Sequence, residues 1–313
     1  MTRNMDTNTY LAFAGAVLIG GANFVAVSFS NRELPPLFGA ALRFALAAII
    51  FFLIMRVSGV SLARGRAAAG AAVYGLLGFG GAYAFIYYAL VGLAAGTVAV
   101  IMAAVPLFTL MMAVLLGQEW FTVRGIVGGS LAIAGIAVLS LGTLGGDLNP
   151  VYLIAAVLGA VAASASTVAA KSLPNVHPLN MNAIGMTSGA FLLTIGSLLL
   201  GERWALPNET NTWLALSWLV VLGSVGLFQL FLYVVRRWTA SATVYALTGM
   251  PVVAVALGAV MLGQPVTPAV LVGGAMVIAA VYVGAARQDT ADAKGRSTPG
   301  PARQREWSNE EGV

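Results

Sequence analysis

The chain has 313 residues, of which 59% are hydrophobic and only 9% charged, whereas a soluble domain carries about 45–50% apolar and roughly 25% charged residues. So few charges cannot cover the surface of a soluble protein of this length, which excludes a cytosolic enzyme, a nucleic-acid-binding protein and a disordered chain. The net charge of +5 does not indicate nucleic acid, because the basic residues lie in short loops between apolar runs.

Apolar runs long enough to cross a bilayer follow one another along the chain. A hydrocarbon core of about 30 Å requires roughly 20 apolar residues in a helix. The runs do not alternate apolar with polar residues, which excludes the strands of a membrane barrel. The sequence therefore predicts an all-α integral membrane protein with ten transmembrane helices, at residues 10–30, 36–55, 67–90, 97–116, 125–141, 151–170, 179–200, 212–235, 240–262 and 267–286.

The ends of the chain and the loop charges predict its orientation. Residues 1–9 form a short tail, and the polar composition of residues 287–313 predicts a disordered one. A secretory signal is the alternative for the first run, which is longer than the apolar core of about 7–15 residues that a signal has. With the N-terminus in the cytoplasm, eight Lys and Arg residues outside the C-terminal tail lie in inside segments, against only Arg32 and Arg203 outside. The positive-inside rule then places both termini in the cytoplasm.

The chain also resembles itself at an offset of 145 residues. This offset aligns Gly78 with Gly223, Gly81 with Gly226, Tyr88 with Tyr233, Pro106 with Pro251, and Gly128–Gly129 with Gly273–Gly274. We therefore expect two five-helix repeats, at residues 10–146 and 147–286. Because five crossings start the second repeat on the opposite side, the repeats must be inverted, an arrangement typical of secondary transporters with a substrate site near mid-membrane. Channels and inert scaffolds that arose by duplication are the alternative.

Several segments of the first repeat resemble a known family. They are Gly21-Ala22-Asn23-Phe24, Pro36 with Arg43, residues 94–116 with Pro106, and residues 125–135. The chain resembles the EamA-type members of the drug/metabolite transporter superfamily over residues 10–286, and within them the YddG-type bacterial exporters of aromatic and other neutral amino acids. The resemblance implies ten helices as two repeats and an amino-acid exporter. Many members have Gly-Glu after the fourth and ninth helices, whereas this chain has Gly117-Gln118-Glu119 and Gly263-Gln264-Pro265.

Arg43 is the one ionisable residue well inside a predicted span. Charged residues inside a membrane are costly and mark functional sites. Arg43 is predicted to bind a substrate carboxylate in a cavity or to anchor the bundle interior; the alternative is that it snorkels to the outer interface. No Asp or Glu occupies the middle of a span, so facilitated diffusion or exchange is expected rather than proton antiport through a buried carboxylate.

Other polar and aromatic side chains are candidates for the substrate cavity. Tyr83 and Tyr87 share one helix face and would stack on flat substrates, although Tyr87 also suits an interfacial aromatic belt. Serines such as Ser164 and Ser166 serve helix packing as readily as substrate binding. The full set of predicted cavity residues is Asn23, Arg43, Tyr83, Tyr87, Ser164, Gln229 and Tyr245.

Pro106 and Pro251 form a repeat-related pair within the fourth and ninth runs. Proline lacks the N–H that would bond to the carbonyl four residues earlier, which kinks a helix. We expect the two prolines to act as hinges; proline is also tolerated in membrane helices without any function.

The sequence has no catalytic signature and no nucleotide-binding loop, and with no cysteine and one histidine no metal or cofactor is expected. We expect a non-enzymatic exporter of neutral and aromatic amino acids in a bacterial inner membrane. Its expected partners are the small-molecule substrate and the bilayer, with no nucleic acid, and a monomer suffices. A broad drug or cation exporter and a passive channel are the alternatives.

Overall fold

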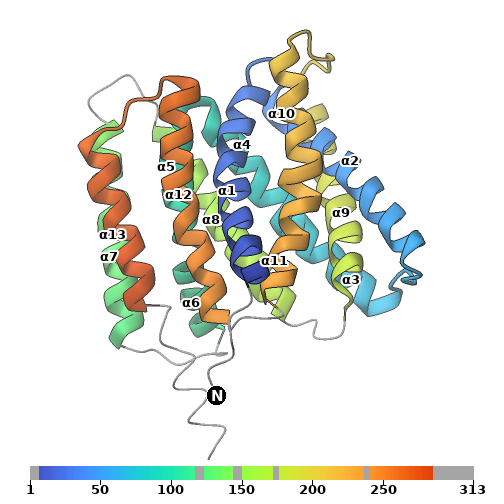
Figure 1. Cartoon of the computed structure of the whole chain (residues 1–313), viewed down its shortest axis with the longest axis horizontal. Coiled ribbons are helices and arrows are strands. Elements are labelled where there is room, and N and C mark those ends of the chain that lie inside the picture. The colour runs from blue at the N-terminus through green and yellow to red at the C-terminus, as the bar shows by residue number, and fades with distance from the viewer. Residues whose placement is uncertain (1–6, 117–122, 144–149, 172–175, 236–239, 285–313) are drawn as a thin grey trace, which may run out of the picture.

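The computed structural model describes residues 7–116, 123–143, 150–171, 176–235 and 240–284, and within these ranges its regular elements are all helical (Figure 1). They are α1 (Thr7–Ser30), α2 (Pro36–Val57), α3 (Gly65–Gly75), η1 (Leu76–Ala82), α4 (Tyr83–Gly92), α5 (Ala95–Ala103), α6 (Val105–Leu115), α7 (Val123–Thr143), α8 (Pro150–Lys171), α9 (Pro178–Leu199), α10 (Thr210–Val220), η2 (Val221–Gly226), α11 (Leu227–Val235), α12 (Ala240–Leu262) and α13 (Pro268–Gly284).

Every one of the ten predicted runs coincides with helical structure. Seven helices of the described ranges are long and apolar enough to cross a membrane: Thr7–Ser30, Pro36–Val57, Gly65–Gly92, Ala95–Leu115, Pro150–Ala170, Pro178–Leu199 and Thr210–Leu230. The other three runs have shorter apolar helices, Gly125–Leu139, Gly249–Leu262 and Pro268–Val283. The all-helical architecture is therefore confirmed for the described ranges, and ten membrane crossings remain a prediction.

Two π-helical segments interrupt the third and eighth runs at corresponding places. η1 begins at Leu76 and η2 at Val221, and this separation equals the offset of the sequence repeat. π-helical segments are rare and occur frequently at functional sites. Gly78 and Gly223, which the sequence repeat aligns, lie inside η1 and η2.

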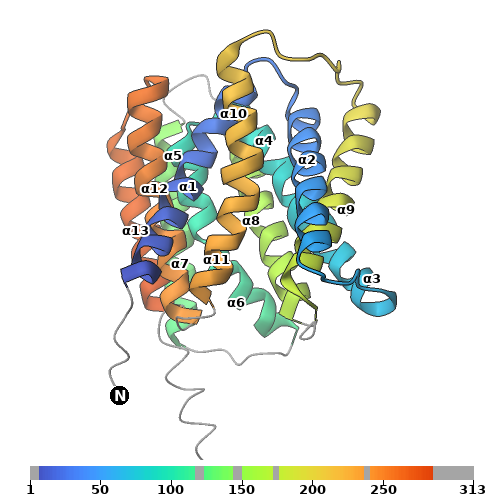
Figure 2. The same cartoon turned by 45° about the vertical axis from the view of Figure 1, so that its right-hand side comes forward.

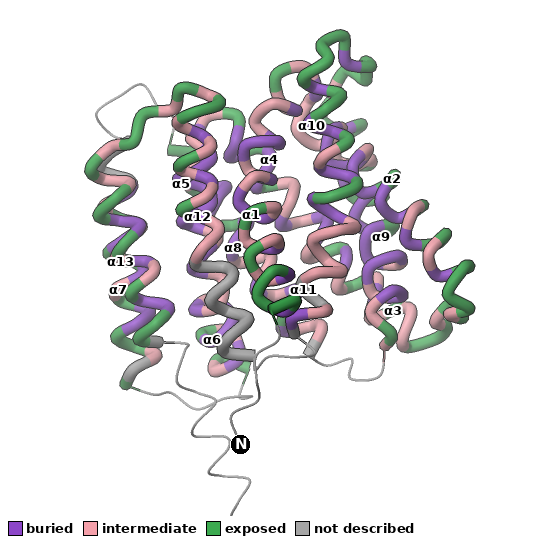
Figure 3. The backbone as a smooth tube through the Cα atoms, in the orientation of Figure 1, coloured by how far each residue is buried: buried purple, intermediate pink, exposed green. Residues whose placement is uncertain are grey.

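Contacts between helices also join corresponding elements of the two halves. α7 packs against α13, and α2 packs against α9. α1 contacts α12 and the α10–α11 run, while α8 contacts α5, α6 and the η1–α4 run. In Figures 1 and 2, α7 and α13 lie at one end of the molecule and α2, α3 and α9 at the other. The helices that lie between these two ends include α1, α4, α5 and α8, and α5 is buried over most of its length (Figure 3).

Glycines allow the closest helix pairs to approach, as small residues do in membrane proteins. A Cβ on Gly75 of α3 would clash with the backbone of Gly185 in α9. A Cβ on Gly135 of α7 would lie 2.9 Å from the carbonyl oxygen of Gly273 in α13. These pairs fix α3 on α9 and α7 on α13.

Three side chains connect the halves at the end of the bundle where α1, α9 and α12 finish. Glu202 accepts hydrogen bonds from the N–H groups of Leu37 (3.1 Å) and Phe38 (2.8 Å) at the start of α2. Glu33 accepts from the N–H groups of Asn208 (2.9 Å) and Glu209 (3.0 Å), just before α10. Carboxylates at helix N-termini satisfy unpaired N–H groups and complement the helix dipole.

Gln264 makes the third connection. Its side-chain Oε1 accepts a hydrogen bond from the N–H of Ala95, the first residue of α5, at 3.0 Å. Gly263, with φ of 63°, ends α12 in the left-handed conformation that favours glycine. An amide oxygen therefore caps α5 without a carboxylate. Residues 117–119 lie outside the described ranges.

Glu33 gives this end of the bundle a pH-dependent stability. The side chain of Thr212 and the N–H groups of Asn208 and Glu209 hold the pKa of Glu33 below its usual value of 4.5. A carboxylate with a lowered folded-state pKa stabilises the fold above the unfolded pKa, and this contribution is lost as the pH falls through the folded pKa.

The variant Glu33→Gln is therefore expected to unfold at a lower temperature than the wild type at neutral pH. The difference between the two unfolding midpoints is expected to shrink as the pH is lowered below 4.5, because the wild-type side chain then also becomes neutral. Thermal unfolding in detergent across this range measures it. A difference that stays constant with pH would show that the Glu33 charge does not contribute.

Candidate functional site

A cavity of about 320 Å³ lies between the helices of both halves. Its volume is at the lower end of the range of about 300–1,000 Å³ typical of small-molecule sites. The lining is mainly apolar and comes from seven of the ten helical runs: Gly20, Asn23, Phe24, Val27, Arg43, Tyr74, Gly78, Phe79, Ala82, Tyr83, Ile86, Ala99, Met102, Ala103, Val105, Ala163, Ser166, Thr167, Leu227, Phe228 and Met250. α7, α9 and α13 contribute none of these residues.

Phe79 is the centre of an aromatic wall. Its ring packs edge to face against Tyr74 (centroids 5.6 Å apart) and Phe228 (5.4 Å) and stacks on Tyr83 (6.3 Å). Phe44 of α2 extends the group, with its ring centroid 4.7 Å from that of Tyr83. These separations are in the range of favourable aromatic pairs. The wall combines rings from α2, the α3–η1–α4 run and α11, so both halves contribute to it.

Arg43 is the one charged side chain among the described residues of the lining. It is fully buried. Its Nε donates to Ser224 Oγ and its Nη2 to the Gly223 carbonyl, both at 3.0 Å. Its Nη1 has no hydrogen-bond partner. The guanidinium carbon lies 5.1 Å from the ring centroid of Tyr83 and 5.0 Å from that of Phe44. The aromatic wall and η2 thus hold Arg43 in place, and the side chain does not snorkel to an interface.

The electrostatics around Arg43 are unbalanced. Hydrogen bonds and cation–π contacts compensate part of the desolvation of a buried cation, but full compensation requires a counter-ion. None of the described lining residues is Asp or Glu. A guanidinium with a free N–H group and no carboxylate can take a carboxylate from a ligand.

Asn23 connects α1 to the same π-helical segment. Its side-chain N–H₂ donates to the Gly223 carbonyl at 3.1 Å, and its oxygen accepts from the indole N–H of Trp218 at 3.3 Å. Gly223 is needed here, because a Cβ at this position would clash with the Asn23 side chain. The Gly223 carbonyl therefore accepts two donors, from Asn23 and Arg43.

The matching contact in the other half involves Ser166 and Gly78. Ser166 of α8 lines the cavity and donates to the Tyr74 carbonyl at 2.9 Å. A Cβ on Gly78 would clash with the Ser166 hydroxyl. Each π-helical segment therefore has a glycine in contact with a polar side chain from the first helix of the other half.

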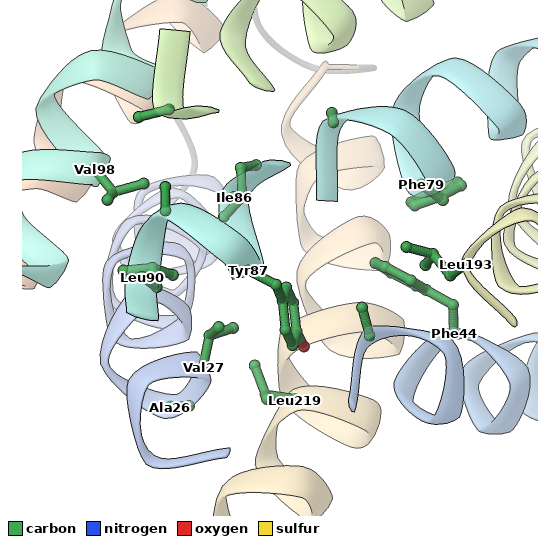
Figure 4. Close-up of a cluster of buried hydrophobic side chains, with 14 of the residues drawn as sticks. Ala26, Val27, Phe44, Phe79, Ile86, Tyr87, Leu90, Val98, Leu193 and Leu219 are labelled. Carbon is green, nitrogen blue, oxygen red and sulfur yellow. The ribbon is translucent and has the colours of Figure 1, made fainter. Parts of the chain in front are cut away.

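Ser164 and Tyr87 are predicted cavity residues that lie outside the lining. Ser164 is fully buried, and its hydroxyl contacts the carbonyls of Ala160 (2.8 Å) and Val105 (3.1 Å). These contacts correspond to a role in helix packing, which was the alternative to substrate binding. Tyr87 is also fully buried, so it does not lie in a lipid-facing belt. Figure 4 shows its ring among Val27, Leu219 and Phe44.

The remaining predicted residues divide between the described and undescribed parts. Asn23, Arg43 and Tyr83 line the cavity. Gln229 is half-buried in α11 and is not among the lining residues. Tyr245 lies in α12, and its side chain is outside the described part of the chain.

The two prolines occupy different positions in their helices. The helical run 95–115 is interrupted at Ala104, and α6 begins again at Val105 with Pro106 in its first turn. In the same turn the Val105 carbonyl accepts the hydroxyls of Thr109 (2.8 Å) and Ser164 (3.1 Å). α12 continues through Pro251. Hinge motion at either proline remains a prediction.

The sequence alone did not identify most residues of the aromatic wall or the partners of Arg43. Phe79, Phe44 and Phe228 carried no signal that separated them from the other apolar residues. Ser224 lies 181 residues from Arg43 in the sequence. The repeat match of Gly78 with Gly223 was the one available indication of this region. No group of three or more His, Cys, Asp or Glu that could hold a metal occurs within the described ranges.

Comparison with known proteins assigns the chain to a family. The family model for EamA-like transporters matches residues 7–141 and 150–284. The chain is 30% identical over 275 residues to the uncharacterized inner membrane transporter YedA of Escherichia coli K12, covering 85% of this chain and 87% of that protein. It is 28% identical to an uncharacterized transporter of Archaeoglobus fulgidus, covering 88% and 97% of the two chains.

Two further matches have lower sequence identity. A probable amino-acid metabolite efflux pump of Salmonella typhimurium is 24% identical over 85% of this chain and 91% of its own. A solved structure that is 21% identical has the same fold, with a TM-score of 0.64 over 90% of this chain and 97% of the other. Since the family model matches two consecutive ranges that together make up most of the sequence, the chain belongs to the EamA-like transporter family.

Proposed function

We propose that this transporter exports aromatic and other neutral amino acids from a bacterial cytoplasm across the inner membrane by alternating access. The observation that carries the proposal is Arg43, a fully buried cation with a free Nη1 in the wall of an otherwise apolar and aromatic cavity. A substrate carboxylate supplies the counter-ion that the described lining lacks.

The aromatic wall supports an aromatic substrate. A flat substrate ring can pack against the wall around Tyr83 and Phe79, whose rings already pair with other rings at favourable separations. The guanidinium carbon of Arg43 lies 5.1 Å from the ring centroid of Tyr83. One small molecule can therefore place its carboxylate at Arg43 and its aromatic ring against this wall. The YddG-type resemblance suggests the same substrates, and the printed name of the Salmonella typhimurium relative includes amino-acid metabolites.

The paired halves support alternating access. Inverted repeats supply two states that are related by exchange of the halves, with the site between them. The offset of 145 residues, the matching positions of η1 and η2 and the contacts between corresponding helices agree with two such repeats. In the orientation predicted from loop charges, Glu33, Glu202 and Gln264 connect the halves on the outer side, so these bonds must break when the outer side opens.

Transport is proposed to be exchange or facilitated diffusion. Proton coupling usually depends on an intramembrane group that titrates, and the described lining residues include no carboxylate and no histidine. A drug or cation exporter would place a carboxylate against its substrate, so this lining disfavours it. A passive channel differs from a carrier in that it gives no counterflow.

Counterflow in proteoliposomes tests the proposal. Vesicles preloaded with unlabelled phenylalanine are expected to accumulate trace labelled phenylalanine in a saturable overshoot. Vesicles loaded with lysine are expected to show none, because the second ammonium group would have no carboxylate partner. An overshoot with methyl viologen but with no amino acid would indicate a cation exporter, and saturable uptake without any overshoot would contradict a carrier.

A further inference from the structure

The charge balance of the cavity indicates a substrate class wider than amino acids. We propose that the cavity binds aromatic monocarboxylates that lack an α-ammonium group, such as aryl 2-hydroxy acids and aryl 2-oxo acids, and binds them more tightly than the corresponding amino acids. This inference rests on the binding of a carboxylate at Arg43 that the proposed function requires.

The net charge of the occupied cavity differs between the two kinds of substrate. Arg43 contributes one positive charge, and no described lining residue contributes a negative one. A monocarboxylate neutralises the site, whereas a zwitterionic amino acid leaves a net positive charge in an apolar cavity. Burial of a charge without a counter-ion is costly, so the monocarboxylate is the better match.

The Gly223 carbonyl, which binds Arg43, has no lone pair left for the ammonium group of an amino acid. A carbonyl oxygen has two lone pairs, and the Gly223 carbonyl already accepts from Asn23 (3.1 Å) and Arg43 (3.0 Å). The Asn23 side-chain oxygen accepts from Trp218. The faces of Phe44 and Tyr83 next to Arg43 are occupied by its guanidinium.

The carbonyl of Val105, another lining residue, also has both lone pairs occupied. The Val105 carbonyl accepts two hydroxyls, those of Thr109 and Ser164. The hydroxyls of Ser166 and Thr167 donate to carbonyls of their surroundings and keep acceptor capacity, but they lie on α8 in the half that does not carry Arg43. In an α-amino acid the ammonium and carboxylate share one carbon neighbour, so the ammonium must stay close to the guanidinium, where like charges repel.

A hydroxyl or carbonyl group in place of the ammonium removes both penalties. A hydroxyl can donate to a neutral acceptor or accept from the free Nη1 of Arg43. A carbonyl can only accept, and Nη1 is a donor of the right kind. In charge and in hydrogen-bonding groups, the site therefore matches the 2-oxo and 2-hydroxy acids that have a carbonyl or hydroxyl group in place of the ammonium group of an aromatic amino acid.

The test compares three compounds that share one aromatic ring and differ only in their polar groups. Phenylalanine, 3-phenyllactate and phenethylamine are each used, labelled outside and unlabelled inside, in counterflow with wild-type proteoliposomes at pH 7.5. Protein-free vesicles and vesicles that contain Arg43→Met measure passive entry. Half-saturation of counterflow is expected at a concentration at least ~10-fold lower for 3-phenyllactate than for phenylalanine, with no overshoot for phenethylamine.

The outcomes separate this inference from the proposed function. An overshoot with phenylalanine and none, or a weaker affinity, with 3-phenyllactate would overturn the inference and leave the amino-acid exporter standing. An overshoot with 3-phenyllactate alone would support the inference and overturn the export of amino acids. An overshoot with phenethylamine, or with none of the three compounds, would contradict both, because a carboxylate at Arg43 would then not be required or not be bound.

Discussion

Arg43→Met is expected to reduce phenylalanine counterflow at least ~100-fold while the protein remains folded, with an unfolding temperature equal to or above that of the wild type. The loss of transport follows because Met cannot bind the substrate carboxylate. The gain in stability follows because a buried charge without a counter-ion is costly, and its replacement by an apolar side chain of similar length removes that cost.

The hydrogen bonds around Arg43 make this variant suitable. After the substitution the Gly223 carbonyl still accepts from Asn23, and the Ser224 hydroxyl still donates to the Leu219 carbonyl at 2.9 Å. No buried donor is therefore left without a partner. Arg43→Lys is the matched control, because it keeps the charge but loses the two-point contact with η2, and partial transport is expected. Full transport by Arg43→Met would show that Arg43 does not bind the substrate, and unfolding of that variant would show that the buried arginine stabilises the fold.

Among substitutions that add one methyl group at a described glycine, Gly75→Ala is expected to lower the free energy of unfolding most. The new Cβ would clash with the backbone of Gly185, and backbone atoms cannot rotate away as a flexible side chain can. Overpacking of this kind costs about 3 kcal/mol, which lowers the unfolding temperature by roughly 4–5 °C for a chain of this size.

Gly81→Ala provides the control within the same helical run. The nearest atoms to a Cβ at Gly81 are the Leu76 carbonyl oxygen at 3.6 Å and the Ala162 Cβ at 3.8 Å, which are ordinary contacts. This variant is expected to unfold within about 1 °C of the wild type, because ordinary contacts add less than ~0.5 kcal/mol of strain. Tryptophan fluorescence during heating in detergent measures both variants. Equal stability of Gly75→Ala and Gly81→Ala would show that α3 and α9 do not approach as closely as described.

The positions of the helical runs could be predicted because the bilayer sets their length. A run of roughly 20 apolar residues is a strong signal, and the predicted run 36–55 differs from α2 by two residues at one end. The residues that face the cavity could not be predicted in the same way. A helix surrounded by lipid and protein is apolar on all faces, so no pattern separated Phe79, which lines the cavity, from Tyr87, which does not.

Arg43 was predictable as an exceptional residue, and its contacts were not. The cost of a charge inside a membrane singles out one arginine without any structure. Its partners, Gly223 and Ser224, belong to the other half and come into contact only through the packing of α2 against η2. Similarly, the repeat match identified Gly78 and Gly223, but the π-helical turns around them have no signature in their apolar sequences.

The proposed function depends most on the binding of a substrate carboxylate at Arg43. Ligand-dependent thermal stabilisation tests this binding without requiring transport. A ligand that binds only the folded state raises the unfolding temperature as its concentration exceeds its dissociation constant. Phenylalanine and 3-phenyllactate are expected to raise the unfolding temperature of the wild type in a saturable manner and to leave that of Arg43→Met unchanged. An equal rise in both proteins would contradict the account, because the ligand would then bind without Arg43.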